Sequence, residues 1–244
     1  MTYITIGDSK DKIKNVLGIP DNSNNYVWNY LNSIIVFDID DKVDGWINRG
    51  NLSVSMGSKT ANSMPITIGS SKKAVVESMG TPEEIIGVHY WYYGNSNITF
   101  DTSFKVVGWN NKGNLPVTLG SKKANGIPIT IGSFKEHVVA AMGTPDNVSD
   151  YSWGYGNSNI SFDFSGKVSG WNNSGDLLVT LGSKTANGDL IAIGSLKEHV
   201  VAAMGTPDDV SDYSWGYGNS NISFDFSGKV SGWNNRGDLP GTIG

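Results

Sequence analysis

Hydrophobic and polar positions along the chain follow one pattern that recurs four times. The Ile-Gly pair that ends the first hydrophobic run of each copy falls at residues 6, 68, 131 and 193, which are spaced by 62, 63 and 62 positions. Residues 131–177 return as residues 193–239 with only three substitutions. A period of this length predicts stacked supersecondary units. The predicted units are repeat 1 (residues 1–62), repeat 2 (63–125), repeat 3 (126–187) and repeat 4 (188–244).

The start of each repeat predicts a short strand followed by a helix. In repeat 3 the Ile-Thr-Ile segment 129–131 alternates as a strand does. Ser133 follows as an N-cap candidate, and Glu136 three residues later completes a capping box. A short helix is expected to end at Gly143, since a proline stands two residues beyond it. The corresponding N-cap candidates in the other repeats are Asp8, Ser70 and Ser195.

Three alternating strands are predicted after the helix. In repeat 3 they cover residues 151–155, 160–164 and 167–172, with tight turns between them. The side chains expected to form the core that faces the helix are Tyr151, Trp153, Tyr155, Ile160, Phe162 and Phe164. The predicted fold class is therefore α+β, with a short helix packed on an antiparallel β-meander in each of four tandem repeats of about 62 residues.

A further alternating run closes each repeat. In repeat 1 this run contains Leu52, Val54 and Met56. Only about nine residues separate it from the Ile-x-Ile segment of the next repeat. Two runs so close together predict a hairpin that joins neighbouring repeats. The spacers between the runs, for example residues 120–125, are expected to be too short and too regular to act as free linkers.

With these elements in place, the sequence resembles the SmpA/OmlA-like repeat, a family that includes outer-membrane assembly lipoproteins and the fold of the β-lactamase inhibitory protein. The resemblance rests on Gly132, the helix segment 138–142, Gly143-Thr144-Pro145, the aromatic strand 151–155, Phe162 and Gly166-Lys167-Val168. It implies an α+β repeat fold and, by analogy of fold, a proteinaceous inhibitor of a hydrolase. The cysteine-free, asparagine-rich composition also resembles the repeat proteins of clostridial spore appendages, which implies assembly on a spore surface.

Composition narrows the classes of partner. The net charge is −5 and the lysine and arginine residues form no run, which argues against nucleic acid. No apolar run approaches 18 residues, so no membrane span is expected. The absence of cysteine excludes disulfides and thiolate metal sites. The first residues lack the basic and apolar regions of a secretory signal, so the chain either works where it is made, leaves by a route without such a signal, or has lost it. The resemblance to spore-appendage proteins implies an extracellular or spore-surface location without a recognisable signal peptide.

Catalytic and metal-binding chemistry has little support in the sequence. His137 and His199 recur on the predicted helices, but neither stands at a recognisable spacing from a nucleophile and an orienting carboxylate. An aspartate recurs at Asp38, Asp101, Asp163 and Asp225. These carboxylates either bind cations or are solvated charges on the strand surface, and the second interpretation is favoured because a calcium loop is missing. We therefore expect no enzyme activity and no catalytic, cofactor-binding or metal-binding residue.

Tryptophan offers a better candidate for binding. Each repeat holds two tryptophans, and the second of each pair gives the row Trp46, Trp109, Trp171 and Trp233. Alternation places this tryptophan on the face opposite the core, unless Gly170 and its equivalents mark a bulge. Beside two asparagines it is suited to stacking on a sugar ring, or it packs between neighbouring repeats. Packing is favoured, because repeats of this size need contacts with one another.

The two ends of the sequence predict self-assembly. Repeat 4 almost copies repeat 3, so neither end carries an atypical capping repeat. The expected contact residues are Ile4 and Ile6 at one end and Leu239 and Ile243 at the other. If these two strands pair, copies of the chain join head to tail. The leading hypothesis is thus a non-enzymatic structural protein that forms a surface or spore-appendage filament from itself or with other surface proteins. The alternative is a module that binds polysaccharide through the tryptophan row.

Overall fold

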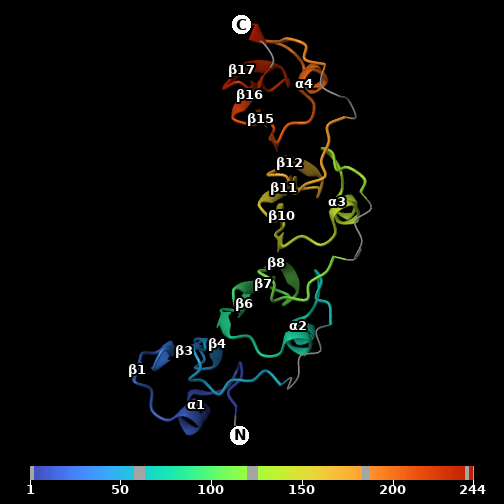
Figure 1. The fold of residues 1–244 in the computed structure, drawn as a ribbon. Helices are drawn as coiled ribbons and strands as arrows, with labels where there is room; N and C mark the ends of the chain where they lie inside the picture. Colours follow the sequence, from blue (N-terminus) through green and yellow to red (C-terminus); the bar gives the residue numbers. More distant parts are fainter. Residues whose placement is uncertain (1–2, 58–63, 120–125, 183–186, 240–241, 244) are drawn as a thin grey trace. The chain divides into compact units, whose positions relative to one another are not determined.

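The computed structural model describes residues 3–57, 64–119, 126–182, 187–239 and 242–243. The chain divides into two compact units, Met1–Leu119 and Gly120–Gly244. Each unit carries the helix–meander pattern twice, and Figure 1 shows each helix at one side of its own strands. The fold is therefore α+β, mostly antiparallel sheet with four short helices. The spacer 120–125, predicted to be too short and too regular to act as a free linker, lies outside the described residues.

The secondary structure repeats in the same order. Unit 1 contains α1 (Lys10–Leu17), β1 (Asn22–Ser23), β2 (Val27–Tyr30), β3 (Ser33–Phe37), β4 (Val43–Ile47), α2 (Lys72–Met79), β5 (Glu84–Ile86), β6 (Tyr90–Tyr93), β7 (Ser96–Phe100) and β8 (Val106–Asn110). Unit 2 contains α3 (Lys135–Met142), β9 (Asn147–Val148), β10 (Ser152–Tyr155), β11 (Ser158–Phe162), β12 (Val168–Asn172), β13 (Ile191–Ala192), α4 (Lys197–Met204), β14 (Asp209–Val210), β15 (Ser214–Tyr217), β16 (Ser220–Phe224), β17 (Val230–Asn234) and β18 (Thr242–Ile243). In unit 1 the strands β1 to β8 lie beside one another in sequence order. In unit 2 the same is true of strands β9 to β17, except that β13 is not part of this sheet.

The helices begin one residue later than the sequence predicts. Ser9 and Ser71 are the N-caps of α1 and α2, whereas Phe134 and Leu196 occupy this position in α3 and α4 without a side-chain cap. The predicted N-cap Ser133 instead accepts a hydrogen bond from the backbone of Thr130, at 3.1 Å. Its hydroxyl stabilises the turn before the helix, so the predicted capping box is wrong.

All four helices end in the predicted way, at a glycine with a positive φ near 80°. A tyrosine of the meander satisfies the carbonyl of that glycine. In repeat 3 the Tyr155 hydroxyl donates to the Gly143 carbonyl at 3.0 Å. Burial raises the pKa of Tyr155, and the nearby carboxylate of Asp146 acts in the same direction. The equivalent residues of the other repeats are Tyr30, Tyr93 and Tyr217.

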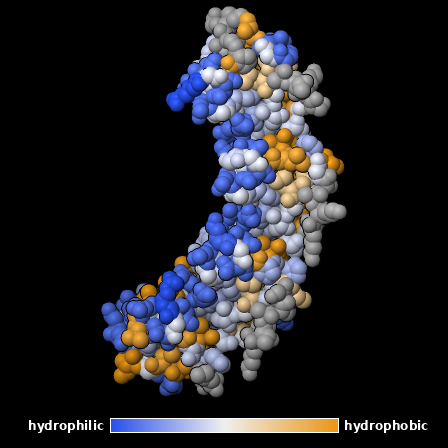
Figure 2. Space-filling model, viewed as in Figure 1, coloured by the Kyte–Doolittle hydropathy of each residue, from blue (hydrophilic) through white to orange (hydrophobic). Residues whose placement is uncertain are grey.

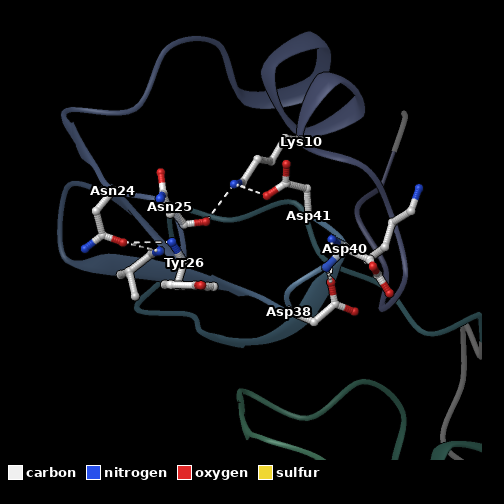
Figure 3. A network of polar contacts seen from close by, with 9 residues as sticks. Lys10, Asn24, Asn25, Tyr26, Asp38, Asp40 and Asp41 are labelled. Atoms are coloured by element: carbon white, nitrogen blue, oxygen red, sulfur yellow. Dashed lines mark hydrogen bonds and ion pairs between the residues drawn. The ribbon is translucent and has the colours of Figure 1, made fainter.

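A lysine at the first position of each helix covers the aromatic core. In repeat 3 the Lys135 ammonium lies 5.6 Å from the Trp153 ring and 5.0 Å from the Phe162 ring, and it donates to the carbonyl of Asp150. Such an ammonium is attracted by the ring faces while its stem covers apolar surface. The same contacts recur at Lys10, Lys72 and Lys197. In repeat 1, Lys10 also reaches Asp41 in the β3–β4 hairpin (Figure 3).

A β-bulge in each meander decides where the second tryptophan lies. In repeat 3 the register shifts between Ser161 and Phe162, so that Phe162 pairs with Val168 and Ile160 pairs with Trp171. Because Ile160 is fully buried, Trp171 lies on the core side of the sheet. The prediction that this tryptophan lies on the opposite face is therefore wrong. The structure contains the β-bulge that was named as the exception to that prediction.

Two of the six predicted core residues of repeat 3 are exposed. Tyr151 is 53% exposed and Phe164 is 96% exposed, although their rings contact each other at a centroid distance of 5.4 Å. Both residues lie outside the strands, which begin at Ser152 and end at Phe162. Strand alternation therefore does not govern them. Figure 2 shows that hydrophobic residues also lie among hydrophilic ones on the visible face of repeat 1.

The Ile-x-Ile segments pair within their own repeat. Ile4 bridges Val54 in parallel, with the Ile4 amide donating to the Ser53 carbonyl at 2.8 Å. The same parallel bridge recurs at Ile66 and at Ile129, and β13 pairs in parallel with β18 in repeat 4. The predicted hairpin between repeats is therefore wrong. The two runs are close in sequence, but each finds its partner about 50 residues away, where it closes its own repeat.

Candidate assembly surface: the junction between repeats

Neighbouring repeats within a unit share one sheet. The last meander strand of repeat 1, β4, pairs antiparallel with β5 of repeat 2, and in unit 2 the strand β12 pairs antiparallel with β14. We call each of these contacts a repeat junction. The short strand that follows the Gly-x-Pro helix stop was missed by the sequence analysis. Its sequence signal is weak, since the strand has only two or three residues and buries a single apolar side chain, Ile85 in β5 and Val210 in β14.

The second tryptophan of each repeat holds the junction together. The Trp46 indole donates from Nε1 to the Pro82 carbonyl at 3.1 Å, and Trp171 donates to the Pro207 carbonyl at 3.2 Å. Both tryptophans are buried, with at most 2% of their surface exposed. The proline predicted to stop the helix thus also accepts a hydrogen bond from the preceding repeat. A buried indole with a satisfied N–H combines a large apolar contact with orientation.

A glycine before that tryptophan permits the close approach of the next repeat. A Cβ atom built on Gly45 would lie 2.4 Å from the Ile85 carbonyl oxygen, and one built on Gly170 would lie 2.2 Å from the Val210 carbonyl oxygen. These distances are far below van der Waals contact, and the obstructing atom is backbone. Any side chain at this position therefore forces the two repeats apart.

Two further hydrogen bonds recur at both junctions. The Thr206 hydroxyl of the Gly-Thr-Pro segment accepts from the backbone of Leu181 at 3.1 Å, and the Asp208 carbonyl accepts from Asn173 at 2.7 Å. In unit 1 the matching pairs are Met56 to Thr81 at 2.9 Å and Asn48 to Glu83 at 2.9 Å. Unit 1 adds an ion pair between Arg49 and Glu84 at 3.5 Å. The helix stop is thus also the docking segment of the repeat.

Repeat 4 presents the same surface without a neighbour. Among the described residues, β16 is the only strand that pairs with β17, and only Val230 at the start of β17 also bonds the backbone of Gly194 and Ser195. A Cβ built on Gly232 meets nothing within 4 Å. Trp233 is half-buried, whereas its counterparts at the two junctions are fully buried, and its indole makes no hydrogen bond within the described part of the chain. We call the outer side of β17, with Gly232 and Trp233, the acceptor edge.

Repeat 1 presents the opposite surface. Within the described ranges β1 pairs with β2 alone, so its outer side is open, and we call it the donor edge. Its sequence differs from that of a junction. Ile19 stands at the threonine position of the docking segment and is 89% exposed, and Ser23 stands where repeats 2 and 4 have Ile85 and Val210. Pro20, whose carbonyl would accept from an indole, is retained.

The predicted site residues therefore lie in two places. Of the tryptophan row, Trp46 and Trp171 lie at the junctions, Trp109 is buried with 3% exposed, and Trp233 lies on the acceptor edge. The predicted self-assembly residues are elsewhere. Ile4 is buried in its own repeat, Ile6 is 38% exposed, Leu239 is 6% exposed, and Ile243 belongs to the parallel pair of β13 and β18.

The recurring aspartates stabilise hairpin loops. The Asp163 carboxylate accepts from the backbone amides of Ser165 and Lys167, at 2.9 and 3.0 Å, and from the Ser165 hydroxyl at 2.8 Å. These bonds, with that from Lys167 foremost, lower the pKa of Asp163. Asp38 binds its loop in the same way, as Figure 3 shows for the amide of Asp40. Among the described residues, no cluster of three or more histidine and acidic side chains could hold a metal ion.

The histidines belong to separate surroundings. His89 lies in the loop before β6, where its Nδ1 lies 2.8 Å from the Phe100 carbonyl. His137 is half-buried on α3 and His199 is exposed on α4. His89 thus belongs to unit 1, and the other two histidines lie on separate helices of unit 2. Over the described ranges, no helix is long and apolar enough to cross a membrane.

The junction in unit 2 is flanked by two hollows. One, of about 570 Å³, lies beside α4 and is lined by Ser169, Leu181, Lys197, Val201, Val210 and Trp215 among others. The other, of about 510 Å³, is polar and is lined mainly by asparagine, serine, aspartate and glycine residues, including Asn172, Asn173, Asp209, Asn219 and Asn221. Both hollows depend on the junction, because residues of the two repeats line each of them.

The arrangement as a whole is suited to adding repeats edge to edge. Backbone pairing supplies the affinity of such a contact, and the tryptophan, glycine and threonine supply its register.

Comparison of the chain with protein-family models, with curated proteins and with solved structures found no match.

Proposed function

We propose that the chain is a non-enzymatic structural protein of four tandem repeats that assembles head to tail into a surface filament, such as a spore appendage. The observation that supports this proposal is the repeat junction. Two junctions with equivalent hydrogen bonds join repeats inside the units, at Trp46 and Trp171. A contact already used twice in one chain is available for use between chains, and a heterologous contact that does not close produces a filament.

The proposal needs both halves of a junction on one molecule, and the chain carries both. The acceptor edge retains the glycine and tryptophan of a junction, and the donor edge retains the strand and Pro20. The same proposal accounts for the resemblance to spore-appendage repeat proteins.

Electron microscopy with sedimentation velocity tests the proposal. The purified chain is examined by negative stain from dilute to concentrated solution, and its sedimentation is followed over the same range. We expect filaments, or a ladder of end-to-end oligomers whose length grows with concentration. A single monomeric species at every concentration would overturn the proposal.

Polysaccharide binding is a second candidate function, and the polar hollow in unit 2 favours it. Its asparagine and aspartate side chains supply the amide and carboxylate groups that bond sugar hydroxyls. The tryptophan row is not available for stacking where it is buried in the junctions. A panel of cell-wall glycans, screened with the chain and with Asn219→Ala, tests this function. Binding that Asn219→Ala weakens without a change in thermal stability supports it, and failure of every glycan to bind contradicts it.

A further inference from the structure

The acceptor edge of repeat 4 has features that a strand edge alone would not explain. Free sheet edges are normally protected by charge, proline or a covering segment, because they invite pairing with another chain. The acceptor edge instead has Gly232 and Trp233, which are the same two residue types that the internal junctions use. Trp233 is partly exposed. The edge is therefore preformed for a repeat-type strand.

We propose that the acceptor edge binds the donor edge of a second copy of this chain, with Trp233 opposite Ser23 and Asn234 opposite Asn22. The proposal rests on the proposed function and assigns the surface through which the copies join. The register follows from the internal junctions, where Trp171 pairs with Val210 and Asn172 with Asp209. In this register the Trp233 indole donates to the Pro20 carbonyl, as Trp171 does to Pro207.

The acceptor edge carries an arginine that an internal junction also uses. Arg236 is one of only three residues by which repeat 4 differs from repeat 3 over residues 193–239, and it replaces Ser174. The equivalent residue of repeat 1 is Arg49, which forms an ion pair across its junction with Glu84. The donor edge carries Asp21 one residue before β1. At the position of Glu84 the donor edge has the neutral Asn22, and the carboxylate of Asp21 already accepts from the Leu31 amide, so Arg236 has a single acidic neighbour one residue further on and no direct counterpart of the internal ion pair.

The contact between copies is weaker than an internal junction. With Ile19 in place of threonine, the donor edge lacks the hydroxyl that accepts from the preceding repeat at 2.9 or 3.1 Å. With Ser23 in place of isoleucine or valine, it lacks the apolar side chain that is 2% or 5% exposed at the internal junctions. Restoring both groups should lower the concentration needed for assembly by about tenfold or more, since a buried valine and a hydrogen bond each contribute about a kcal/mol.

Cysteine pairing tests the register directly, because the natural chain has no cysteine. Asn22→Cys and Asn234→Cys chains are prepared separately, mixed at an assembling concentration and oxidised. We expect a disulfide-linked heterodimer in the mixture and far less in either variant alone. A third chain, Asn219→Cys, serves as the matched control, since Asn219 is an asparagine of repeat 4 in the turn between β15 and β16.

A blocking variant tests the surface. Gly232→Val introduces a side chain into space that is empty in the free chain, so the chain should fold normally, but the incoming strand would meet a Cβ at about 2 Å, as at Gly170. The control is Ser223→Val, a change on the strand paired with β17, where repeat 1 has Val36. We expect Gly232→Val to abolish assembly and Ser223→Val to leave it intact.

A strengthening variant tests the donor edge. Ile19→Thr combined with Ser23→Val should shift assembly to lower concentration, whereas Ile39→Thr, at an isoleucine of similar exposure in a hairpin loop, should not. If the natural chain stays monomeric at every concentration, the proposed function fails, and if the double variant also stays monomeric, this inference fails with it. If the natural chain forms filaments that Gly232→Val does not prevent, the inference alone is overturned and the filament contact lies elsewhere.

Discussion

The glycine of the repeat junction permits a prediction with an internal control. Gly170→Ala and Gly232→Ala are the same substitution in the same sequence, Val-Ser-Gly-Trp-Asn, in two successive repeats. At Gly170 the added methyl group would lie 2.2 Å from the Val210 carbonyl oxygen, whereas at Gly232 it meets nothing within 4 Å. Any difference between the two variants therefore reports the junction and not the strand.

The magnitude follows from the displacement that the methyl group requires. To reach ordinary contact, β14 must retreat from β12 by about 1 Å. That movement stretches the bond from Trp171 to Pro207, now 3.2 Å, and the bond from Asn173 to Asp208, now 2.7 Å, beyond hydrogen-bonding range. Two lost hydrogen bonds cost about 2 kcal/mol and the repacking about 1–3 kcal/mol more, so we expect Gly170→Ala to destabilise the junction by about 3–5 kcal/mol.

Urea unfolding with hydrogen exchange measures the effect. We expect the unfolding midpoint of unit 2 to fall for Gly170→Ala and to stay the same or rise slightly for Gly232→Ala, because alanine restricts the unfolded chain more than glycine does. Exchange of the Trp171 indole proton should accelerate only in the first variant. Equal behaviour of the two variants would refute the close approach on which the junction is built.

Three further substitutions test single contacts. Tyr155→Phe removes the hydroxyl that donates to Gly143 and should lower the free energy of unfolding by about 1 kcal/mol, measured by urea titration; an unchanged value would mean that water replaces the bond. Leu196→Ser supplies the N-cap that α4 lacks and should raise the melting temperature, with a gain of about 0.5–1 kcal/mol; a lower melting temperature would contradict the assigned helix start. For Asp163 the folded pKa is lowered, so its contribution is present above the unfolded pKa of about 4 and is lost as the pH falls through the folded value. The melting-temperature difference between the natural chain and Asp163→Asn should therefore shrink in strong acid, and a constant difference would exclude the carboxylate as its cause.

The meander could be predicted because its signals are local. Trp153, Tyr155, Ile160 and Phe162 alternate on two adjoining strands, and all four are buried as expected. The helix end was also predictable, since Gly143 terminates the helix through its own backbone conformation. These features depend on residues within a few positions of each other.

The contacts between repeats could not be predicted in the same way. β14 has two residues and one apolar side chain, so its pairing with β12 depends on Trp171 and Gly170, which lie 36 or more residues away. The parallel bridge from Ile4 to Val54 spans a similar separation. The bulge at the β11–β12 pairing reverses the face of Trp171, and a single extra residue leaves little trace in the hydrophobic pattern.

The parallel bridge that closes each repeat has a consequence for how such a gene can change. Ile129 and Val179, near the two ends of repeat 3, are adjacent in space. A stretch of DNA encoding one whole repeat can therefore be duplicated or lost in frame, and each repeat of the product keeps the bridge that closes it. The near-identity of residues 131–177 and 193–239 is what a recent duplication of this kind leaves behind. A change in the number of repeats therefore leaves the pairing inside each repeat intact.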